Sequence, residues 1–254
     1  MAATKKTETI SIKPIQLAET TVRVVGLTEL CMHKWSEKAK KEMLESMQKN
    51  KMAELGVVKT KQREDKKPFT EFIDSMYWVS GKPTLEEKEQ LEKAYEQFKV
   101  LTGETEFIPM EKICEMAGLE HIAKNARFGF PSVAFKSAAI SGAYRKKWVP
   151  DKVGLRGAFW IEGDQRDLVE IKGCLPVLRE DSVKIQGSGT DLRYRGTFEN
   201  WYADLKIKYD MNGNYSISDI LNYISAGGFT CGVGEWRVEK GGNFGAFEIS
   251  GTVD

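Results

Sequence analysis

The sequence predicts an α+β fold in which strands and helices follow one another in the order βαββαβ. Short segments with alternating apolar and polar residues, at Thr21–Val25 and Tyr202–Tyr209, are typical of half-buried strands. Two segments with helical spacing and helix-start signals lie at Ser132–Lys147 and Ser216–Ala226. Seven glycines fall within the 21 residues from Gly227 to Phe247, a density that favours a loop over regular structure.

The first part of the chain predicts strands and then a basic helix. Thr7–Val25 alternates and is rich in Thr, Ile and Val, which indicates one or two strands that end at Gly26. Ser36 is a suitable N-cap for a helix over Glu37–Lys49. Lysines at the start of this segment are placed to line a phosphate path, or to form a solvated helix face.

The region from residue 49 to 127 is predicted to be an insertion. Gly56–Pro83 is rich in lysine and weakly patterned, which indicates a connection without regular structure. Thr84 and Glu87 form a capping-box pattern at the start of an acidic helix, and a second helix is expected over Met110–Asn125. The predicted domains are therefore a core of residues 1–48 and 128–254 and an insertion, mainly helical, of residues 49–127.

The core is predicted to resume at Phe128. Pro131 marks the entrance to the helix Ser132–Lys147, whose small residues allow close approach to a neighbouring element. A strand pair is expected within Arg156–Gly173, and the last strand within Phe244–Ser250, after the glycine-rich loop. This order of elements is the ferredoxin-like, or split-βαβ, pattern that RNA-recognition motifs also use.

The composition is that of a globular protein, with 41% hydrophobic and 30% charged residues. No apolar run suggests a signal peptide or a membrane span, so we expect a cytoplasmic protein without a membrane partner. The net charge of +1 conceals segregated blocks: eleven Lys and Arg against six Asp and Glu over His33–Lys67, four against ten over Thr84–Glu120, and eight against one over His121–Trp160. Such blocks predict binding to a polyanion or head-to-tail association of copies.

Several kinds of chemistry have no motif in this sequence. Four scattered cysteines without CxxC spacing and only two histidines argue against a zinc site and against a disulfide framework. GSGT at Gly187–Thr190 lacks the lysine of a phosphate-binding loop. No cofactor is therefore expected.

Two motifs carry a resemblance to a known family. GVGEWRVEKGGNFGAFEI follows the helix SISDILNYISAGG, and FPSVAFKSAAI places Lys136 in the first core helix. In position and content these resemble the glycine-rich loop and the helix entry of the RAMP superfamily, whose members form the repeating backbone of CRISPR effector complexes. The chain also resembles proteins of tailed phages, although Val238 stands where their last motif would have proline. The resemblance covers about two thirds of the chain. The sequence shows no cleavage-type active site and no endoribonuclease histidine, which indicates binding rather than cleavage. We expect the protein in the host cytoplasm if a phage encodes it.

Basic and aromatic residues that could meet a nucleic-acid strand occur in four segments. The glycine-rich loop carries a flat indole beside a guanidinium and an ammonium, which suits stacking and phosphate contact. The TDLRYRG segment would form an acid–arginine ladder on one strand face, which could bind phosphate, hold a neighbouring subunit or pair within the chain. The predicted nucleic-acid-binding residues are His33, Lys34, Lys38, Lys136, Arg145, Lys146, Lys147, Arg193, Arg195, Trp236, Arg237 and Lys240. Among the tryptophans, Trp35, Trp148 and Trp236 are predicted to stack on bases, and Trp160 and Trp201 to lie in the core.

One short pattern offers an enzymatic alternative. Asp151, Glu170 and Lys172 match the PD-(D/E)xK arrangement of magnesium-dependent nucleases, in which two carboxylates hold the metal and the lysine orients water. An ordinary turn at Pro150 and Asp151 explains the same residues. The leading hypothesis is a non-enzymatic protein that binds single-stranded DNA or RNA and forms a homo-oligomer along it. The nuclease and a structural component that binds only protein are the alternatives.

Overall fold

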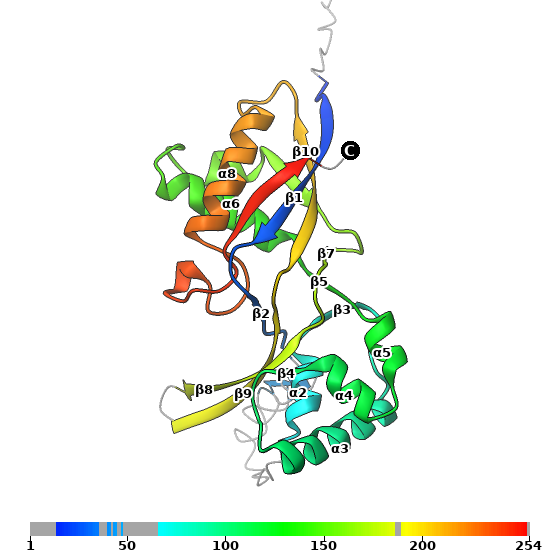
Figure 1. Cartoon of the computed structure of the whole chain (residues 1–254). Helices are drawn as coiled ribbons and strands as arrows, with labels where there is room; N and C mark the ends of the chain where they lie inside the picture. Colours follow the sequence, from blue (N-terminus) through cyan, green and yellow to red (C-terminus); the bar gives the residue numbers. More distant parts are fainter. Residues whose placement is uncertain are drawn as a thin grey trace, which may run out of the picture.

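The computed structural model describes residues 14–35, 40–41, 43–44, 47, 66–185 and 189–252. Within these residues the fold is mixed α+β, with seven α-helices and three antiparallel sheets. Figure 1 shows helices α6 and α8 beside one sheet, and helices α3, α4 and α5 at the opposite end of the molecule. The predicted helix Glu37–Lys49 and the residue Lys38 lie outside the described residues, apart from five single positions of that helix.

The largest part of the predicted core forms one four-stranded antiparallel sheet. Its strands, in spatial order, are β11 (Phe247–Thr252), β1 (Leu17–Gly26), β10 (Tyr202–Asp210) and β6 (Phe159–Glu162). Alternate residues such as Val22 and Val24 are fully buried, because one face of the sheet carries the helices. The predicted strands at Thr21–Val25 and Tyr202–Tyr209 are confirmed, and the last strand begins three residues later than predicted.

Helices α6 (Ser132–Arg145) and α8 (Ile217–Thr230) touch through glycine. A Cβ at Gly227 would lie 2.4 Å from the carbonyl carbon of Ala138, and one at Gly142 would lie 2.4 Å from the nitrogen of Gly227. The prediction that α8 ends at Ala226 is therefore wrong. Its last glycines continue the helix, because their missing side chains allow this close contact.

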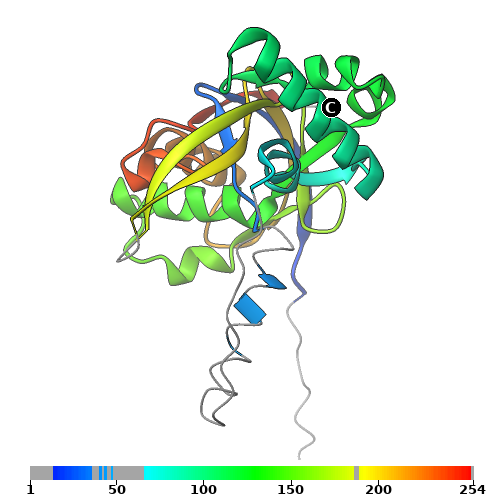
Figure 2. The same ribbon diagram turned by 90° about the horizontal axis from the view of Figure 1, so that it is seen from below.

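A second antiparallel sheet is built on a long hairpin. Its spatial order is β2 (Leu30–Met32), β9 (Gly189–Phe198), β8 (Val177–Ile185) and β4 (Ile108–Pro109). In this region the sequence analysis placed a strand only in TDLRYRG, and the partner strand β8 was not predicted. Figure 2 shows β8 and β9, in yellow, curving together as one ribbon.

The third sheet corrects the predicted strand pair. Its order is β3 (Tyr77–Ser80), β5 (Arg127–Pro131) and β7 (Leu168–Ile171). β6 and β7 were expected to pair within Arg156–Gly173, yet β6 pairs with β10 and β7 pairs with β5. Gly129 of β5 makes room for this pairing, because a Cβ there would lie 2.9 Å from the Cβ of Leu168.

The inserted region is more ordered than predicted. Part of the expected connection forms α2 (Pro68–Asp74) and β3, and the aromatic residues of α2 are buried against the rest of the chain. The capping box of Thr84 and Glu87 is confirmed at the start of α3 (Leu85–Thr102). The predicted helix Met110–Asn125 is two helices, because Gly118 adopts φ +68° between them. These two helices are α4 (Met110–Met116) and α5 (Glu120–Asn125).

One hydrophobic cluster joins the predicted core and the predicted insertion. It contains Phe69 and Tyr95 from α2 and α3 as well as Phe135 and Trp201 from the other end of the molecule. A short helix, α7 (Val153–Arg156), lies between α6 and β6. In the part of the chain that the structure describes, no helix is long and apolar enough to cross a membrane.

Candidate nucleic-acid interface

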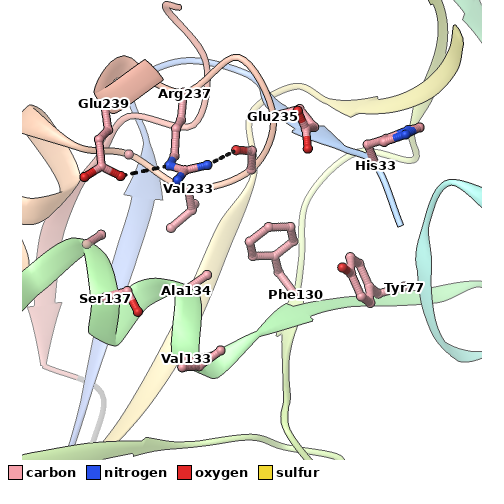
Figure 3. A pocket seen from close by; sticks show the side chains of 13 residues that line it. His33, Tyr77, Phe130, Val133, Ala134, Ser137, Val233, Glu235, Arg237 and Glu239 are labelled. Carbon is pink, nitrogen blue, oxygen red and sulfur yellow. Dashed lines mark hydrogen bonds and ion pairs between the residues drawn. The ribbon is translucent and has the colours of Figure 1, made fainter. Parts of the chain in front are cut away.

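A cleft of about 300 Å³ lies where the glycine-rich loop faces α6. Its walls come from the segment after β2, from β3 and β5, from the first turns of α6 and from the loop (Figure 3). The residues that line it are His33, Tyr77, Phe130, Val133, Ala134, Ser137, Ala138, Gly232, Val233, Gly234, Glu235, Arg237 and Glu239. The cleft therefore brings together the loop and the helix that carry the two sequence motifs.

Backbone hydrogen bonds hold the glycine-rich loop in place. Glu235 N–H donates to the carbonyl of Cys31 at 2.8 Å, and Gly245 N–H donates to the carbonyl of Glu29 at 2.7 Å. A Cβ at Gly245 would lie 1.7 Å from the carbonyl oxygen of Val233, so only glycine fits there. These glycines therefore allow close contact between the loop and the chain's own backbone.

Two arginines share one carboxylate at the edge of the cleft. Arg237 Nε donates to Glu239 Oε2 at 3.2 Å, and Arg145 Nη2 donates to Glu239 Oε1 at 3.2 Å. Burial raises the pKa of Glu239, but the hydrogen bonds and charges of the two arginines outweigh it and leave that pKa below its ordinary value. Glu239 thus joins the loop to the last turn of α6.

The end of α6 presents an exposed group of basic and aromatic side chains, which we call the α6 patch: Tyr144, Arg145, Lys146, Lys147 and Trp148. Tyr144 is 46% exposed and Trp148 is 52% exposed, and the three cations between them are exposed as well. In the described part of the chain, Lys146 and Lys147 form no ion pair. Cations at a helix C-terminus also favour the helix dipole, so some of this charge stabilises α6.

The arginines of the β8–β9 hairpin are paired within the chain. The strand register sets Arg179 opposite Arg195 and Asp181 opposite Arg193, so these side chains share one face. Asp181 accepts hydrogen bonds from Arg179 Nε at 2.8 Å and from Arg195 Nη1 at 2.9 Å. We call the set Arg179, Asp181, Asp191, Arg193 and Arg195 the hairpin ladder. Of the three predicted roles for TDLRYRG, pairing within the chain is the one the structure contains.

His33 lies against this ladder. Its Nε2 is 3.0 Å from Arg193 Nη1, and because a guanidinium can only donate, Nε2 accepts and Nδ1 carries the hydrogen. Burial lowers the pKa of His33 to about 4, and the charges of Arg195 and Arg193 contribute to this shift. Within the described residues, His33 Nδ1 and Arg195 Nε are buried without a hydrogen-bond partner.

Trp236 lies above the buried end of the ladder. Its ring centre is 5.8 Å from the guanidinium carbon of Arg195, whereas its own side chain remains 43% exposed. Arg195 is only 5% exposed, which removes its guanidinium from the surface that a strand could reach. Trp236 also adopts φ +51°, a left-handed backbone conformation that is uncommon for a residue other than glycine.

The remaining predicted binding residues lie apart from the cleft wall. Lys136 points at the ring of Phe159, 5.6 Å from its centre, and burial lowers the pKa of Lys136. Lys34 lies over the ring of Tyr77 at 5.5 Å, and Lys240 is exposed at the end of the 3-10 turn Val238–Lys240.

The predictions for the other tryptophans are partly confirmed. Trp201 is buried, as predicted, and Trp35 is 57% exposed. The core prediction for Trp160 is wrong, because this residue is 40% exposed. Its neighbours Phe159 and Ile161 face the helices, so the alternation of β6 turns Trp160 to the opposite face of the sheet.

The three residues of the nuclease pattern each have another partner. Asp151 accepts hydrogen bonds from the N–H groups of Val153 and Gly154 in the first turn of α7. Glu170 lies 3.8 Å from Arg127. Lys172 donates to Asp204 at 2.9 Å. No group of three or more His, Cys, Asp or Glu residues that could hold a metal ion occurs among the described residues.

Sequence reasoning missed the aromatic and acidic part of the cleft. Tyr77 falls in the predicted connection, and Phe130, Glu235 and Glu239 belong to the two motifs without a predicted role of their own. Phe130, Glu235 and Glu239 could have been found from their position in the sequence. The two glutamates lie next to residues that were already predicted to bind, and Phe130 begins the motif FPSVAFKSAAI that carries Lys136. No protein-family model matches the chain, and no curated protein sequence matches it.

Proposed function

We propose that this chain is a binding protein for single-stranded nucleic acid, with α6 as the element along which the strand lies. The observation that carries the proposal is the α6 patch, in which two exposed aromatic rings flank three exposed cations. Single-strand binders combine positive charge that follows the phosphates with aromatic rings on which bases stack.

The cleft extends this surface along the same helix. Val133 and Ser137 line the cleft near the start of α6, and Arg145 at its end reaches Glu239 on the cleft edge. Fourteen helical residues span roughly 20 Å. That length suits a path for a few nucleotides from the cleft to the α6 patch.

The fold and the assembly belong to the same proposal. β1, α6, β6, β10, α8 and β11 follow in chain order, and the spatial strand order β11-β1-β10-β6 with antiparallel neighbours supports a ferredoxin-like core. The glycine-rich loop between α8 and β11 supports the RAMP-like resemblance. We propose further that copies associate as a homo-oligomer along the strand, in the cytoplasm, with the acidic α3 region of one copy near the basic region of the next.

The test is a titration of labelled single-stranded DNA and RNA with the protein over a series of salt concentrations. We expect retention at low ionic strength and an affinity that falls steeply as salt rises, because bound cations displace counterions from the phosphates. No retention at low ionic strength would overturn the proposal and leave a component that binds only protein. Magnesium-dependent cleavage that Glu170→Ala abolishes would instead establish a nuclease.

A further inference from the structure

One carboxylate in the cleft wall is open to a ligand. Glu239 is held by both Arg237 and Arg145, and His33 is neutral because burial and neighbouring arginines lower its pKa to about 4. Glu235 remains, and no described residue gives its carboxylate a hydrogen bond or an ion pair. Its oxygens can accept hydrogen bonds from a ligand that donates them, and its charge disfavours a phosphate at the same place.

Tyr77 lies on the wall opposite Glu235 (Figure 3). Burial raises the pKa of its hydroxyl, the charges of Glu235 and then of Asp167 raise it further, and the charge of Lys40 lowers it. The hydroxyl therefore keeps its proton and can donate a hydrogen bond. Its ring meets that of Phe130 edge to face at 5.7 Å. Figure 3 shows both rings rising from the cleft floor toward Glu235.

We infer that the cleft binds one unstacked nucleobase of the strand and that Glu235 recognises the hydrogen-bond donors on its Watson–Crick edge. This inference rests on the proposed function for its ligand class. The cleft has a volume of about 300 Å³, at the small end of the range for ligand sites. This volume suits a single base and is too small for a double-stranded nucleic acid. The aromatic wall of Tyr77 and Phe130 supplies the surface against which a flat ring packs.

The carboxylate sets the base preference. An ionised Glu accepts hydrogen bonds only, so it pairs with the amino groups of guanine, cytosine and adenine. Guanine offers two adjacent donors, its ring N–H and its amino group, and can occupy both carboxylate oxygens. Thymine and uracil offer one N–H between two carbonyl oxygens, which the carboxylate repels. We therefore expect guanine to bind best and thymine or uracil to bind worst.

The cations near the cleft lie outside its lining. The ammonium of Lys34 lies over the Tyr77 ring, and Lys34 is not among the residues that line the cleft. A nucleotide whose base enters the cleft keeps its phosphate outside, where the α6 patch supplies positive charge.

The experiment compares three short oligomers by fluorescence anisotropy: oligothymidylate, the same oligomer with isolated guanines, and the same oligomer with hypoxanthine at those positions. Hypoxanthine lacks the amino group of guanine. We expect the guanine oligomer to bind about tenfold more tightly than oligothymidylate, and the hypoxanthine oligomer to lie between them. Glu235→Gln keeps the shape of the side chain but removes the charge, so it should abolish most of the guanine preference. Glu248→Gln, a carboxylate on β11, is the matched control and should leave the preference intact.

A second measurement separates the two proposals. Free guanosine is titrated into the protein and into Glu235→Gln by calorimetry. Equal affinity for the three oligomers, unchanged in Glu235→Gln, overturns the base recognition alone. Guanosine binding that depends on Glu235, without binding of any oligomer, supports the cleft assignment and overturns the strand-binding function. Binding of neither oligomers nor guanosine overturns both.

Discussion

The α6 patch and the hairpin ladder are both rich in arginine or lysine, yet they differ in what surrounds their charges. In the α6 patch, Lys146 and Lys147 are exposed and, within the described residues, have no carboxylate partner. In the hairpin ladder, Asp181 binds two arginines at 2.8 and 2.9 Å, and Arg195 is 5% exposed. The first set can exchange its counterions for phosphates, and the second has already satisfied its charges within the fold.

Strand register, more than the number of cations, therefore decides which basic residues are available to bind phosphates. Pairing β8 with β9 places each ladder carboxylate on the same face as the arginines, and the glycine-rich loop then covers one end of that face with Trp236. At the end of α6, among the described residues, Glu239 is the carboxylate that pairs with the patch, and it pairs with Arg145 alone of the three cations. Substitutions in the two regions should therefore have opposite consequences for stability and for binding.

The largest effect is expected when the buried ladder is deprived of its shared carboxylate. Asp181→Asn leaves the guanidinium of Arg195 buried without its counter-charge, so the free energy of unfolding should fall by about 3–5 kcal/mol. Urea denaturation followed by circular dichroism measures it. Asp191→Asn, a more exposed ladder carboxylate, is the matched control and should cost less than about 1 kcal/mol. Equal effects of the two substitutions would contradict a buried ladder.

The second prediction concerns pH. His33 has a folded pKa of about 4, below the ordinary value of 6.5, because it is buried beside two arginines. Between these values the unfolded state binds a proton that the folded state does not, so stability is full above pH about 6.5 and falls as pH drops toward 4. The decrease reaches at most about 3 kcal/mol, and solvent screening of the partly buried ring reduces it. Denaturation midpoints of the protein and of His33→Asn across this range measure it, and the variant should show much less of the slope.

Local signals predicted the helices well where the cap and the spacing lie in adjacent residues. The capping box at Thr84 is one example, and the helix predicted over Ser132–Lys147 and observed over Ser132–Arg145 is another, since their information is local. The pairing of β7 with β5 was not predicted, because it depends on contacts between Phe128, Ile171 and the buried cluster that only the tertiary fold creates. Gly227 and Gly228 were predicted to end α8 too early. The close contact of Gly227 with α6, which a side chain would prevent, cannot be seen in the local sequence.

The sequence singled out the two motifs that form the candidate site. It did not predict which charged side chains in that site are paired. The glycine-rich loop and the α6 helix do meet at the cleft, and Arg237 lies in its wall. No sequence pattern indicates that Arg237 is neutralised by Glu239 or that Glu235 lacks a partner among the described residues, because both depend on how the loop folds back on itself. Arg195 was predicted as a binding residue from strand alternation alone, which cannot tell an exposed face from one that a loop covers.

The third prediction compares two exposed tryptophans. Trp148→Ala in the α6 patch should weaken single-strand binding by roughly 1–3 kcal/mol, the usual contribution of one stacked base. Because its ring lies 6.2 Å from that of Tyr223, stability should fall by up to about 1 kcal/mol. Trp160→Ala is the matched control, since Trp160 is 40% exposed on the face of the sheet away from the helices, and its affinity should not change. An equal weakening by both substitutions would place the strand on the sheet face.

The smallest effect, and the most specific one, is expected in the salt dependence. Replacing Lys146 and Lys147 together by alanine removes two exposed cations, so the slope of log affinity against log salt should decrease by roughly 0.7 for each phosphate that is no longer neutralised. Folding stability should change by less than about 0.5 kcal/mol, since neither side chain forms an ion pair in the described part of the chain. Arg193→Ala is the comparison: it also removes one positive charge, but from a guanidinium already bound to Asp191 and His33, so the slope should stay the same. If Arg193→Ala lowers the slope as much as the loss of one lysine does, the hairpin ladder also contacts the nucleic acid. The distinction between the two regions would then be wrong.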